Sequence, residues 1–580
     1  FLRRLSLDLK RKIFGLALLV FFTANIIADE LPIIEYKSIH HPVISKTGMV
    51  VSQRQIASEV GATILRNGGN AVDAAVATGL ALAVVLPRAG NIGGGGFMVV
   101  YMKDLNKTIA IDYREKAPSA AHRDLFLDEN GNYDKRKAQF SLLSAGVPGT
   151  VAGLHHALIS YGTMSWKEVI APAVKLAEEG FAVPHDLANI LASENYKRRL
   201  TSNKAGAQSF YKENNENYAA GEILAQRDLA WSLKQLRDFG PKAFYEGEIA
   251  KKIVKEMERN GGLISMEDLK QYKPLERKPV QGTFRDFKIV SMPPASSGGI
   301  HLIQMLNMLE EFPIKKLGFG SSDTIHLMAE VMKRAYADRS KHLGDMDFYD
   351  VPFSLMDKKY AKELNKSISL QKISLSKDIL PGDPYPYESP DTTHYSVMDK
   401  FGNVVSNTYT LNFSYGSGIV IPGTGMLMNN EMDDFSSKPG VPNGYGLLGS
   451  EANSIQGNKR PLSSMTPTII FKDDQPYLVL GSPGGSRIIT TVLQVALNVM
   501  EHEMNVAQAV NSPRIHHQWL PEVLMIEDGF SPDTVQLLED KGYKIYPSRT
   551  MGSVQAIVKE GDYFYGAADP RRPNSGAIAP

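Results

Sequence analysis

The chain changes character at one stretch, which reads Asp391-Thr392-Thr393-His394-Tyr395-Ser396-Val397. A Pro- and Asp-rich segment, residues 381–390, precedes it and is typical of an exposed linker. The turn-forming residues 399–403 follow it, and then a second β-rich run, residues 404–411. The pattern therefore predicts a β-hairpin over residues 393–411 that begins where the linker ends.

The centre of this hairpin decides which residues face each other. If Phe401 is the centre, Thr392 lies opposite Thr410, with Cβ atoms roughly 5 Å apart. One face is then largely apolar, and the other is polar. The polar face carries Thr392, His394, Ser396, Ser406, Thr408, Thr410 and Asn412. We expect this polar face to be either solvated or part of a functional site.

A threonine at such a boundary suits a nucleophile that is created by chain cleavage. A threonine hydroxyl needs a base near neutral pH, and a free α-amino group, with a pKa of about 8, can be that base on the same residue. Cutting the bond between Asp391 and Thr392 would create this amine. The segment alone leaves an ordinary Thr-rich edge hairpin as an open alternative.

Further motifs before and after residues 391–397 all resemble motifs of a single protein family. Downstream they are Thr408-Tyr409-Thr410-Leu411-Asn412, Leu427-Met428-Asn429-Asn430-Glu431-Met432-Asp433-Asp434-Phe435-Ser436, Arg460-Pro461-Leu462-Ser463-Ser464-Met465-Thr466-Pro467-Thr468 and Gly481-Ser482-Pro483-Gly484-Gly485-Ser486-Arg487. Upstream they are Ala89-Gly90-Asn91-Ile92-Gly93-Gly94-Gly95-Gly96-Phe97, Asp112-Tyr113-Arg114-Glu115-Lys116-Ala117-Pro118, Gly146-Val147-Pro148-Gly149-Thr150-Val151 and Ser296-Ser297-Gly298-Gly299. From about Gly48 to Arg571, the chain resembles the γ-glutamyltranspeptidase family.

The resemblance implies a fold and a division of the chain. The fold is α+β, a four-layer αββα sandwich of the N-terminal nucleophile hydrolase type. Residues 29–391 would form a large subunit and residues 392–580 a small subunit, both sharing one core. The grouping of predicted strands apart from helices also favours α+β layers over a doubly wound sheet.

Six residues are candidates for holding an amino-acid-like substrate head. Such a head needs a cation for its carboxylate, and Arg114 can bind a carboxylate with two parallel hydrogen bonds. Its ammonium group needs acceptors. Taken singly, each residue type is usually a solvated surface residue or a cap. The resemblance implies that Arg114, Ser463 and Ser464 bind the carboxylate and that Asn412, Glu431 and Asp434 surround the ammonium group.

The catalytic assignments follow from the same resemblance. Backbone N–H groups of glycines can approach a developing oxyanion closely, although the sequence alone favours a simple turn at Gly484 and Gly485. The resemblance makes these two glycines the oxyanion hole and has Thr410 support the Thr392 hydroxyl. The Gly/Pro-rich loop 438–446 would be a lid with Tyr445 as its gate, and the alternative is a surface loop.

The implied activity is self-cleavage between Asp391 and Thr392, followed by γ-glutamyl transfer from glutathione or similar amides to water, amino acids or peptides. No cofactor and no metal is implied. One alternative is a β-lactam side-chain acylase on the same fold. Another is a non-catalytic periplasmic protein that binds glutamyl compounds without self-cleavage.

Composition and residue spacing argue against several other functions and kinds of site. The formal net charge is +1, and no basic stripe interleaved with aromatic residues suggests nucleic acid binding. The chain has no cysteine, which excludes disulfides, thiol catalysis and thiolate metal sites. Residues 93–96 are glycines, but no Lys-Ser/Thr pair follows, so we expect a tight turn rather than a phosphate loop. The adjacent pairs at His40, His155 and His516 have diverging side chains and make poor metal sites.

Residues 1–28 have the pattern of a targeting segment. Arg3, Arg4, Lys10, Arg11 and Lys12 form a basic region, and residues 13–28 are almost wholly apolar. This apolar run is short for a membrane span and fits a secretory signal cleaved after Ala28, with a retained anchor as the alternative. We therefore expect a periplasmic or secreted protein without a membrane span in its processed form.

Overall fold

The computed structural model describes residues 38–379, 392–438, 441–444 and 446–580. The chain divides into a short N-terminal unit, Phe1–His41, and a compact unit, Pro42–Pro580, and the latter holds every described helix and strand. The predicted signal segment, Asp391 and Tyr445 lie outside the described residues. Within the described part, no helix is both long and apolar enough to cross a membrane.

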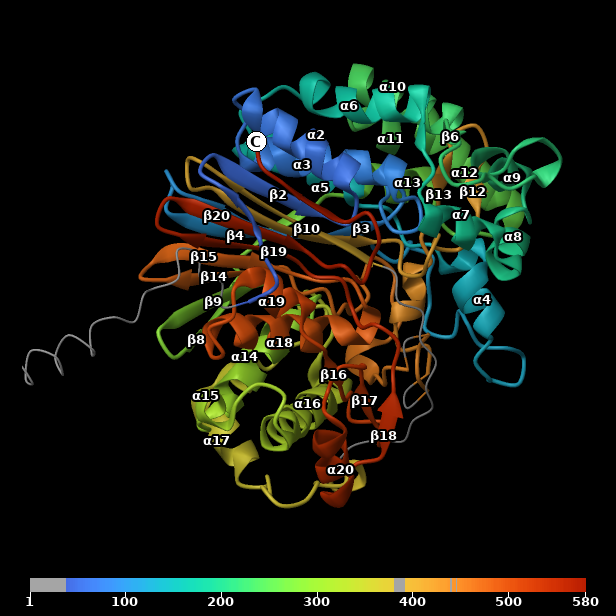
Figure 1. Cartoon of the computed structure of the whole chain (residues 1–580). Helices are drawn as coiled ribbons and strands as arrows, with labels where there is room; N and C mark the ends of the chain where they lie inside the picture. Colours follow the sequence, from blue (N-terminus) through green and yellow to red (C-terminus); the bar gives the residue numbers. More distant parts are fainter. Residues whose placement is uncertain (1–37, 380–391, 439–440, 445) are drawn as a thin grey trace, which may run out of the picture. The chain divides into compact units, whose positions relative to one another are not determined.

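Two antiparallel sheets lie at the centre of the described residues of the compact unit (Figure 1). The first runs in the order β21 (Gly576–Ile578), β2 (Gly48–Ser52), β10 (Thr392–Asp399), β11 (Val404–Thr410), β3 (Gly95–Met102), β4 (Lys107–Tyr113) and β7 (Leu275–Arg277). The second runs in the order β1 (Val43–Ser45), β20 (Tyr563–Ala568), β19 (Gln555–Glu560), β15 (Gln475–Leu480), β14 (Thr468–Lys472), β9 (Phe287–Ser291) and β8 (Val280–Phe284). Strands from both sides of residue 392 contribute to each sheet, so the two parts of the chain share one core.

Helices cover the outer face of each sheet (Figure 1). The first sheet packs against α2 (Gln55–Arg66), α3 (Ala71–Val85) and α5 (Thr150–Tyr161). The second packs against α14 (Gly298–Leu309), which in turn contacts α16 (Ser322–His342) and α18 (Ile488–Met500). The resulting order, helices–sheet–sheet–helices, confirms the predicted four-layer α+β sandwich.

The remaining elements surround this core. The region between residues 135 and 271 is mostly helical, with α4 (Lys135–Phe140), α6 (Trp166–Glu179), α7 (His185–Ala192), α8 (Glu194–Leu200), α9 (Lys204–Phe210), α10 (Arg227–Phe239), α11 (Lys242–Tyr245), α12 (Glu248–Asn260) and α13 (Met266–Gln271). Later helices are α15 (Ile314–Leu317), α17 (Lys358–Asn365), α19 (Val506–Asn511) and α20 (Pro532–Asp540). Short strands are β5 (Phe181–Ala182), β6 (Ile223–Leu224), β12 (Val420–Ile421), β13 (Met426–Leu427), β16 (Ile515–His516), β17 (Leu524–Ile526) and β18 (Ile545–Pro547).

Helix α3 shows how the sequence forms the outer layers. Its N-cap, Asn70, accepts hydrogen bonds from the N–H groups of Val72 and Asp73, and the Asp73 side chain accepts from the N–H of Asn70. This reciprocal capping box fixes the start of the helix. Every residue of α3 is buried, which agrees with a sequence that is apolar on all sides. The helix therefore forms a rigid support beneath the hairpin β10–β11.

The hairpin β10–β11 has the predicted register. Thr392 pairs with Thr410, and Met398 pairs with Val404, so residues whose numbers sum to 802 face each other throughout. No bulge interrupts this ladder. The turn is stabilised by Asp399, whose Oδ1 accepts hydrogen bonds from the N–H groups of Phe401 and Asn403, both at 2.9 Å. The hairpin places Thr392 and Thr410 together at one end of the sheet.

The polar face of the hairpin is not solvated, so that alternative was wrong. Ser396 donates its hydroxyl to the carbonyl of Gln555 at 2.9 Å, and Ser406 donates to the carbonyl of Leu480 at 3.0 Å. Both contacts reach the second sheet. Burial lowers the pKa of His394 to about 3, so this histidine is neutral and bonds to Thr408 at 2.8 Å. Most of the polar face therefore joins the two sheets, and only its end at Thr392 borders a cavity.

The glycine run 93–96 allows backbones to approach closely, as expected. A Cβ atom on Gly94 would clash with the carbonyl oxygen of Thr410, and one on Gly96 would lie 2.5 Å from the carbonyl oxygen of Thr408. The run continues directly into β3 rather than into a helix. These glycines therefore bring β3 against β11 near Thr410.

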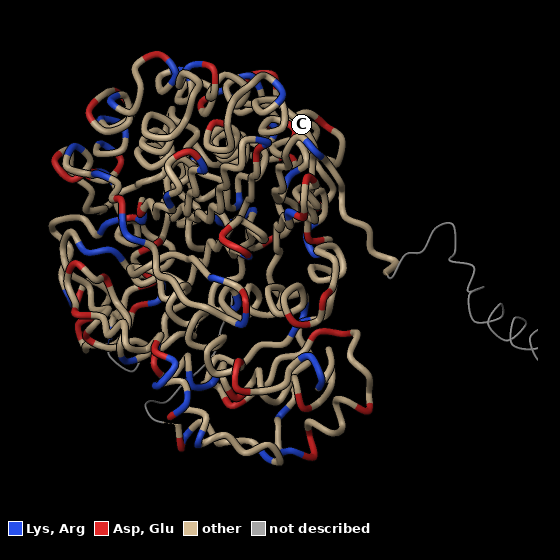
Figure 2. Tube along the Cα trace, turned by 90° about the vertical axis from the view of Figure 1, so that its left-hand side faces the viewer, with Lys and Arg blue, Asp and Glu red and all other residues tan. Residues whose placement is uncertain are grey.

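Charged residues are distributed without a dominant sign. Segments with lysine or arginine and segments with aspartate or glutamate are intermingled in the view of Figure 2, in agreement with the net charge of +1.

Candidate active site

Thr392 and Thr410 meet at the ends of their strands. The Thr392 hydroxyl donates to Thr410 Oγ1 at 3.3 Å, a long hydrogen bond, and both residues are nearly buried. Thr410 Oγ1 also accepts a hydrogen bond from the Asn412 N–H at 2.9 Å. The contact confirms the predicted proximity of the two threonines.

Asn91 holds the backbone of Thr410 and was not among the predicted site residues. Its Nδ2 donates to the carbonyl of Thr410 at 2.9 Å, and its Oδ1 accepts from the Gly94 N–H at 2.9 Å and from the Thr150 hydroxyl at 2.7 Å. The amide thus joins the glycine turn, α5 and β11. Its place two residues before the glycine run was the available signal.

A cavity opens beside Thr392 and contains about 290 Å³ of space, part of it open to solvent. Most of the predicted site residues line it: Arg114, Thr392, Thr410, Asn412, Glu431, Asp434, Ser463, Ser464 and Gly485. Four further lining residues were not predicted: Arg339, Leu447, Met465 and Ile488. The fold therefore gathers residues that are several hundred positions apart into one small, mainly polar pocket.

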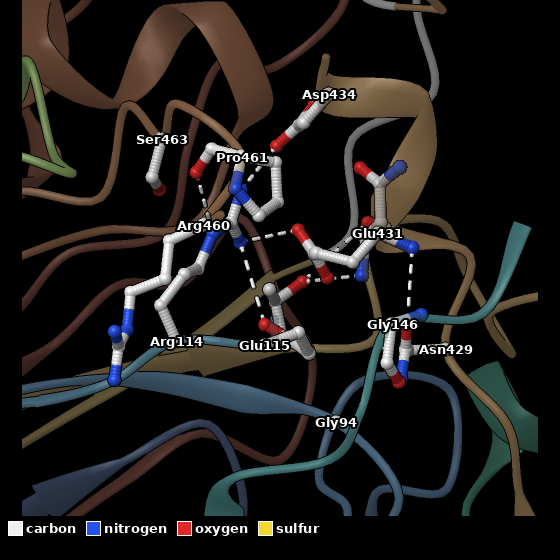
Figure 3. Close-up of polar contacts among 12 residues, drawn as sticks. Gly94, Arg114, Glu115, Gly146, Asn429, Glu431, Asp434, Arg460, Pro461 and Ser463 are labelled. Atoms are coloured by element: carbon white, nitrogen blue, oxygen red, sulfur yellow. Dashed lines mark hydrogen bonds and ion pairs between the residues drawn. The ribbon is translucent and has the colours of Figure 1, made fainter. Parts of the chain in front are cut away.

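Arg114 is buried at the centre of a group of carboxyl groups (Figure 3). Its Nη1 bonds to Glu431, its Nη2 donates to Asp434 Oδ2 at 2.6 Å, and its Nε donates to the carbonyl of Pro461 at 3.2 Å. Burial alone would lower the pKa of Arg114, but Glu431 and Asp434 outweigh it and raise that pKa above its ordinary value. Arg114 is therefore a permanent cation whose fork binds two carboxyl groups separately.

Glu115 extends this group and was not singled out from the sequence. Its Oε2 lies 3.8 Å from Arg114 Nη1. Burial raises the pKa of Glu115 to about 7 and that of Glu431 well above its ordinary value. The two carboxyl groups also interact with each other, so this pair carries less than its full negative charge near neutral pH.

The segment with Ser463 and Ser464 is fixed by backbone contacts to the part of the chain before α14. The Ser463 N–H donates to the carbonyl of Ala295 at 2.8 Å, and the Ser297 N–H donates to the carbonyl of Ser463 at 2.9 Å. Ser463 Oγ accepts from the Met465 N–H at 3.1 Å. Its own O–H can still donate, and the side chain lines the cavity.

Gly484 and Gly485 form the turn between β15 and α18. Their φ angles are +138° and +55°, in the left-handed region where a side chain is strained. Gly485 lines the cavity next to Thr392, and Gly484 directly precedes it. This geometry explains why both positions are glycine, and it places backbone N–H groups at the beginning of a helix.

The described parts of the loop 438–446 are tied to the residues beside Arg114. The Gly444 N–H donates to Asp433 Oδ2 at 2.9 Å, and Asn443 Nδ2 donates to Asp434 Oδ1 at 3.3 Å. Leu447, which follows the loop, lines the cavity. The root of the predicted lid therefore lies at the pocket, although Tyr445 itself lies outside the described residues.

Within the described chain, no group of three or more His, Asp or Glu side chains could hold a metal ion. The buried histidines His516 and His517 contact different partners, as expected for neighbours in sequence. His516 Nδ1 bonds to the Thr490 hydroxyl at 2.8 Å, whereas His517 Nδ1 accepts from the Trp519 N–H at 3.2 Å.

Known proteins resemble the chain over nearly its whole length. A family model described as gamma-glutamyltranspeptidase matches residues 57–579. The glutathione hydrolase proenzyme of Escherichia coli (strain K12) is 53% identical over 537 residues, which cover 92% of each chain.

Two solved structures resemble the fold. The cephalosporin acylase from Bacillus halodurans superimposes with a TM-score of 0.82 at 26% identity, covering 95% of this chain and 99% of the other. The Helicobacter pylori gamma-glutamyltranspeptidase has a TM-score of 0.56 at 43% identity, covering 60% of this chain and 97% of the other. The likeness to the acylase thus extends over nearly the whole chain.

Proposed function

The chain belongs to the γ-glutamyltranspeptidase family, and from this premise we propose that it is a self-cleaving γ-glutamyltransferase and glutathione hydrolase with Thr392 as its nucleophile. The observation that carries the proposal is the position of Thr392, which begins β10, faces Thr410 and borders the pocket around Arg114. The Escherichia coli relative is named a proenzyme, in line with activation by cleavage.

The first reaction is cleavage of the chain itself. Thr392 Oγ attacks the carbonyl carbon of Asp391, and the bond from that carbon to the Thr392 nitrogen breaks. The products are an ester at Oγ and a free α-amino group. Water then hydrolyses the ester, which restores the Thr392 hydroxyl and leaves Asp391 as a C-terminal carboxylate. Residues 29–391 and 392–580 become a large and a small subunit that share the core.

The second reaction transfers the γ-glutamyl group. The α-amino group of Thr392 takes the hydroxyl proton while Oγ attacks the γ-carbonyl carbon of glutathione. Backbone N–H groups of Gly484 and Gly485 stabilise the oxyanion, and Thr410 supports the Thr392 oxygen. The leaving amine departs with the proton held by the α-amino group. Water, or the amine of an amino acid or peptide, then attacks the γ-glutamyl ester and releases Thr392.

The pocket suits a head group that carries both charges. We assign the α-carboxylate to Arg114, Ser463 and Ser464, and the ammonium group to Asn412, Glu431 and Asp434. In the structure Arg114 pairs with the acidic residues themselves. A zwitterionic head can exchange these pairs without leaving a charge unmatched. A glutaryl side chain has no ammonium group and would leave the acidic residues uncompensated, which favours γ-glutamyl substrates over those of an acylase.

The remaining assignments extend from the same premise. Tyr445 would act as the gate of the loop 438–446, whose described neighbours contact Asp433 and Asp434. Residues 1–28 would direct the protein to the periplasm or the outside of the cell. No cofactor takes part in either reaction.

A denaturing gel of the purified protein, combined with assays of aniline release, tests this function. We expect two fragments and release of the aniline from γ-glutamyl anilide. An uncut protein that binds glutamyl compounds but releases nothing would support the binder. A clear preference for a glutaryl anilide over the γ-glutamyl anilide would support the acylase.

Replacing Thr410 by valine tests the contact with the nucleophile. Thr410→Val keeps the β-branched shape and removes the hydroxyl that accepts from Thr392, so folding should be little affected. We expect slower self-cleavage and slower turnover, each by roughly tenfold or more, because both reactions use the same oxygen. Time courses on gels and single-turnover kinetics measure the two rates. Unchanged rates for both would remove Thr410 from the site.

A further inference from the structure

A second arginine, Arg339, lines the pocket from α16. It is only 4% exposed, so its guanidinium group is almost completely withdrawn from water. Arg114 is paired with Glu431 and Asp434, whereas no salt bridge involves Arg339 among the described residues. The pocket therefore contains one cation with direct counter-charges and one without.

Arg339 contacts two serines instead of carboxylates. Its Nε donates to Ser297 Oγ at 2.9 Å, and its Nη2 donates to Ser464 Oγ at 3.1 Å. The Ser297 hydroxyl in turn donates to the carbonyl of Ser463 at 2.7 Å. Arg339 thus holds Ser464 directly and the backbone of Ser463 through Ser297.

The direction of these hydrogen bonds orients the Ser464 hydroxyl. A guanidinium group can only donate, so Ser464 Oγ must accept from Arg339. The Ser464 O–H then has to donate elsewhere, and Ser464 lines the cavity. An oxygen of an anionic ligand is the best acceptor for a hydroxyl that is already polarised by a neighbouring cation.

The charge of Arg339 points to the same ligand. Burial lowers the pKa of Arg339 to about 10, so the group still carries its charge at neutral pH. A buried cation without a paired anion is unfavourable, and a ligand carboxylate placed beside Ser464 would relieve this cost. The one carboxyl group with a named electrostatic effect on Arg339 among the described residues, that of Asp434, is already paired with Arg114.

We propose that Arg339 is a specificity-determining positioning residue for the α-carboxylate of the γ-glutamyl donor. Arg339 orients the Ser464 hydroxyl toward that carboxylate. It also supplies positive charge to the carboxylate, because the charge of Arg114 is already partly balanced by Glu431 and Asp434. The inference rests on the proposed function, because it names the part of the donor that the pocket selects.

The test compares two anilides that differ only in the α-carboxylate. γ-Glutamyl anilide carries the α-carboxylate, and 4-aminobutyryl anilide has the same amine and γ-amide without it. For Arg339→Gln we expect KM for γ-glutamyl anilide to rise about tenfold or more, with kcat changed by less than about threefold. The kcat/KM for 4-aminobutyryl anilide should stay within about twofold of the unsubstituted protein, so discrimination between the anilides falls.

Arg334→Lys is the matched control on the same helix. Arg334 is equally buried, but it contacts Glu330 and Ser367 rather than the pocket. Its replacement should leave the discrimination between the two anilides unchanged, which separates a loosened helix from a lost carboxylate contact. The double variant Arg339→Gln/Ser464→Ala should lose little more than either single variant, because the two residues act as one unit.

Two results would overturn the inference. Equal losses on both anilides would make Arg339 merely structural, and unchanged discrimination would remove it from recognition. If Arg339→Gln does not fold, Arg339→Lys replaces it, since lysine keeps the charge but cannot hold Ser297 and Ser464 together. An unsubstituted protein that fails to cleave γ-glutamyl anilide would instead contradict the proposed function.

Discussion

Thr392→Ala is expected to remain a single uncut chain and to lose γ-glutamyl transfer by at least about 10⁴-fold. Both reactions begin with attack by the Thr392 oxygen, so removing it blocks the creation of the amine base as well as the later chemistry. The methyl group of Thr392 is also lost, but the residue is at the end of its strand, and the register is fixed by the rest of the ladder. A denaturing gel and an anilide assay measure the two effects.

Thr393→Val is the matched control for this variant. Thr393 pairs with Tyr409 on the opposite face of the hairpin, and its hydroxyl has no hydrogen-bond partner among the described residues. Valine keeps its shape, so cleavage and turnover should proceed. Cleavage of the Thr392→Ala chain at the same bond, or retained transfer, would contradict the assignment of the nucleophile.

Arg114→Lys is expected to raise KM for glutathione roughly 30-fold, which corresponds to about 2 kcal/mol for a bidentate charged contact. The arginine fork holds Glu431 and Asp434 with separate nitrogens, and in the proposed function the same fork binds the substrate α-carboxylate. A lysine ammonium keeps the charge but cannot hold this geometry. Self-cleavage should proceed, because it does not involve the substrate head.

Arg54→Lys is the control for the general effect of losing a buried ion pair in which an arginine makes two hydrogen bonds to one carboxylate. Arg54 binds both oxygens of Asp186, at 3.1 and 2.7 Å, and does not line the pocket. The Arg54→Lys protein should have a KM for glutathione within about twofold of that of the unsubstituted protein. If the KM for glutathione is also unchanged in Arg114→Lys, Arg114 is excluded from substrate binding.

The register of the hairpin could be predicted because its causes are local. The residues around Asp399 define a turn, and alternation of side chains then fixes every pair from Met398 to Thr392. The same alternation could not decide what covers the polar face. Ser396 and Ser406 bond to the second sheet, and only the fold brings those carbonyl groups into place.

Only some of the residues that line the pocket could be predicted from the sequence. Sequence motifs identified Arg114 and Asp434 separately as candidate substrate-binding residues, but not the ion pair between them. This pair joins residues 320 positions apart and depends on the packing of the whole sandwich. Arg339 had no local signal at all, since it is one of several basic residues near the end of α16 and reaches Ser464 from 125 positions away. Long-range contacts of this kind follow from the layers rather than from any motif.

N-terminal sequencing of the smaller fragment of the purified protein tests the central claim most directly. We predict a fragment that begins Thr392-Thr393-His394, because only this start gives the proposed nucleophile its own amine base. A fragment that begins at any other residue, or full transfer activity in an uncut chain, would contradict it.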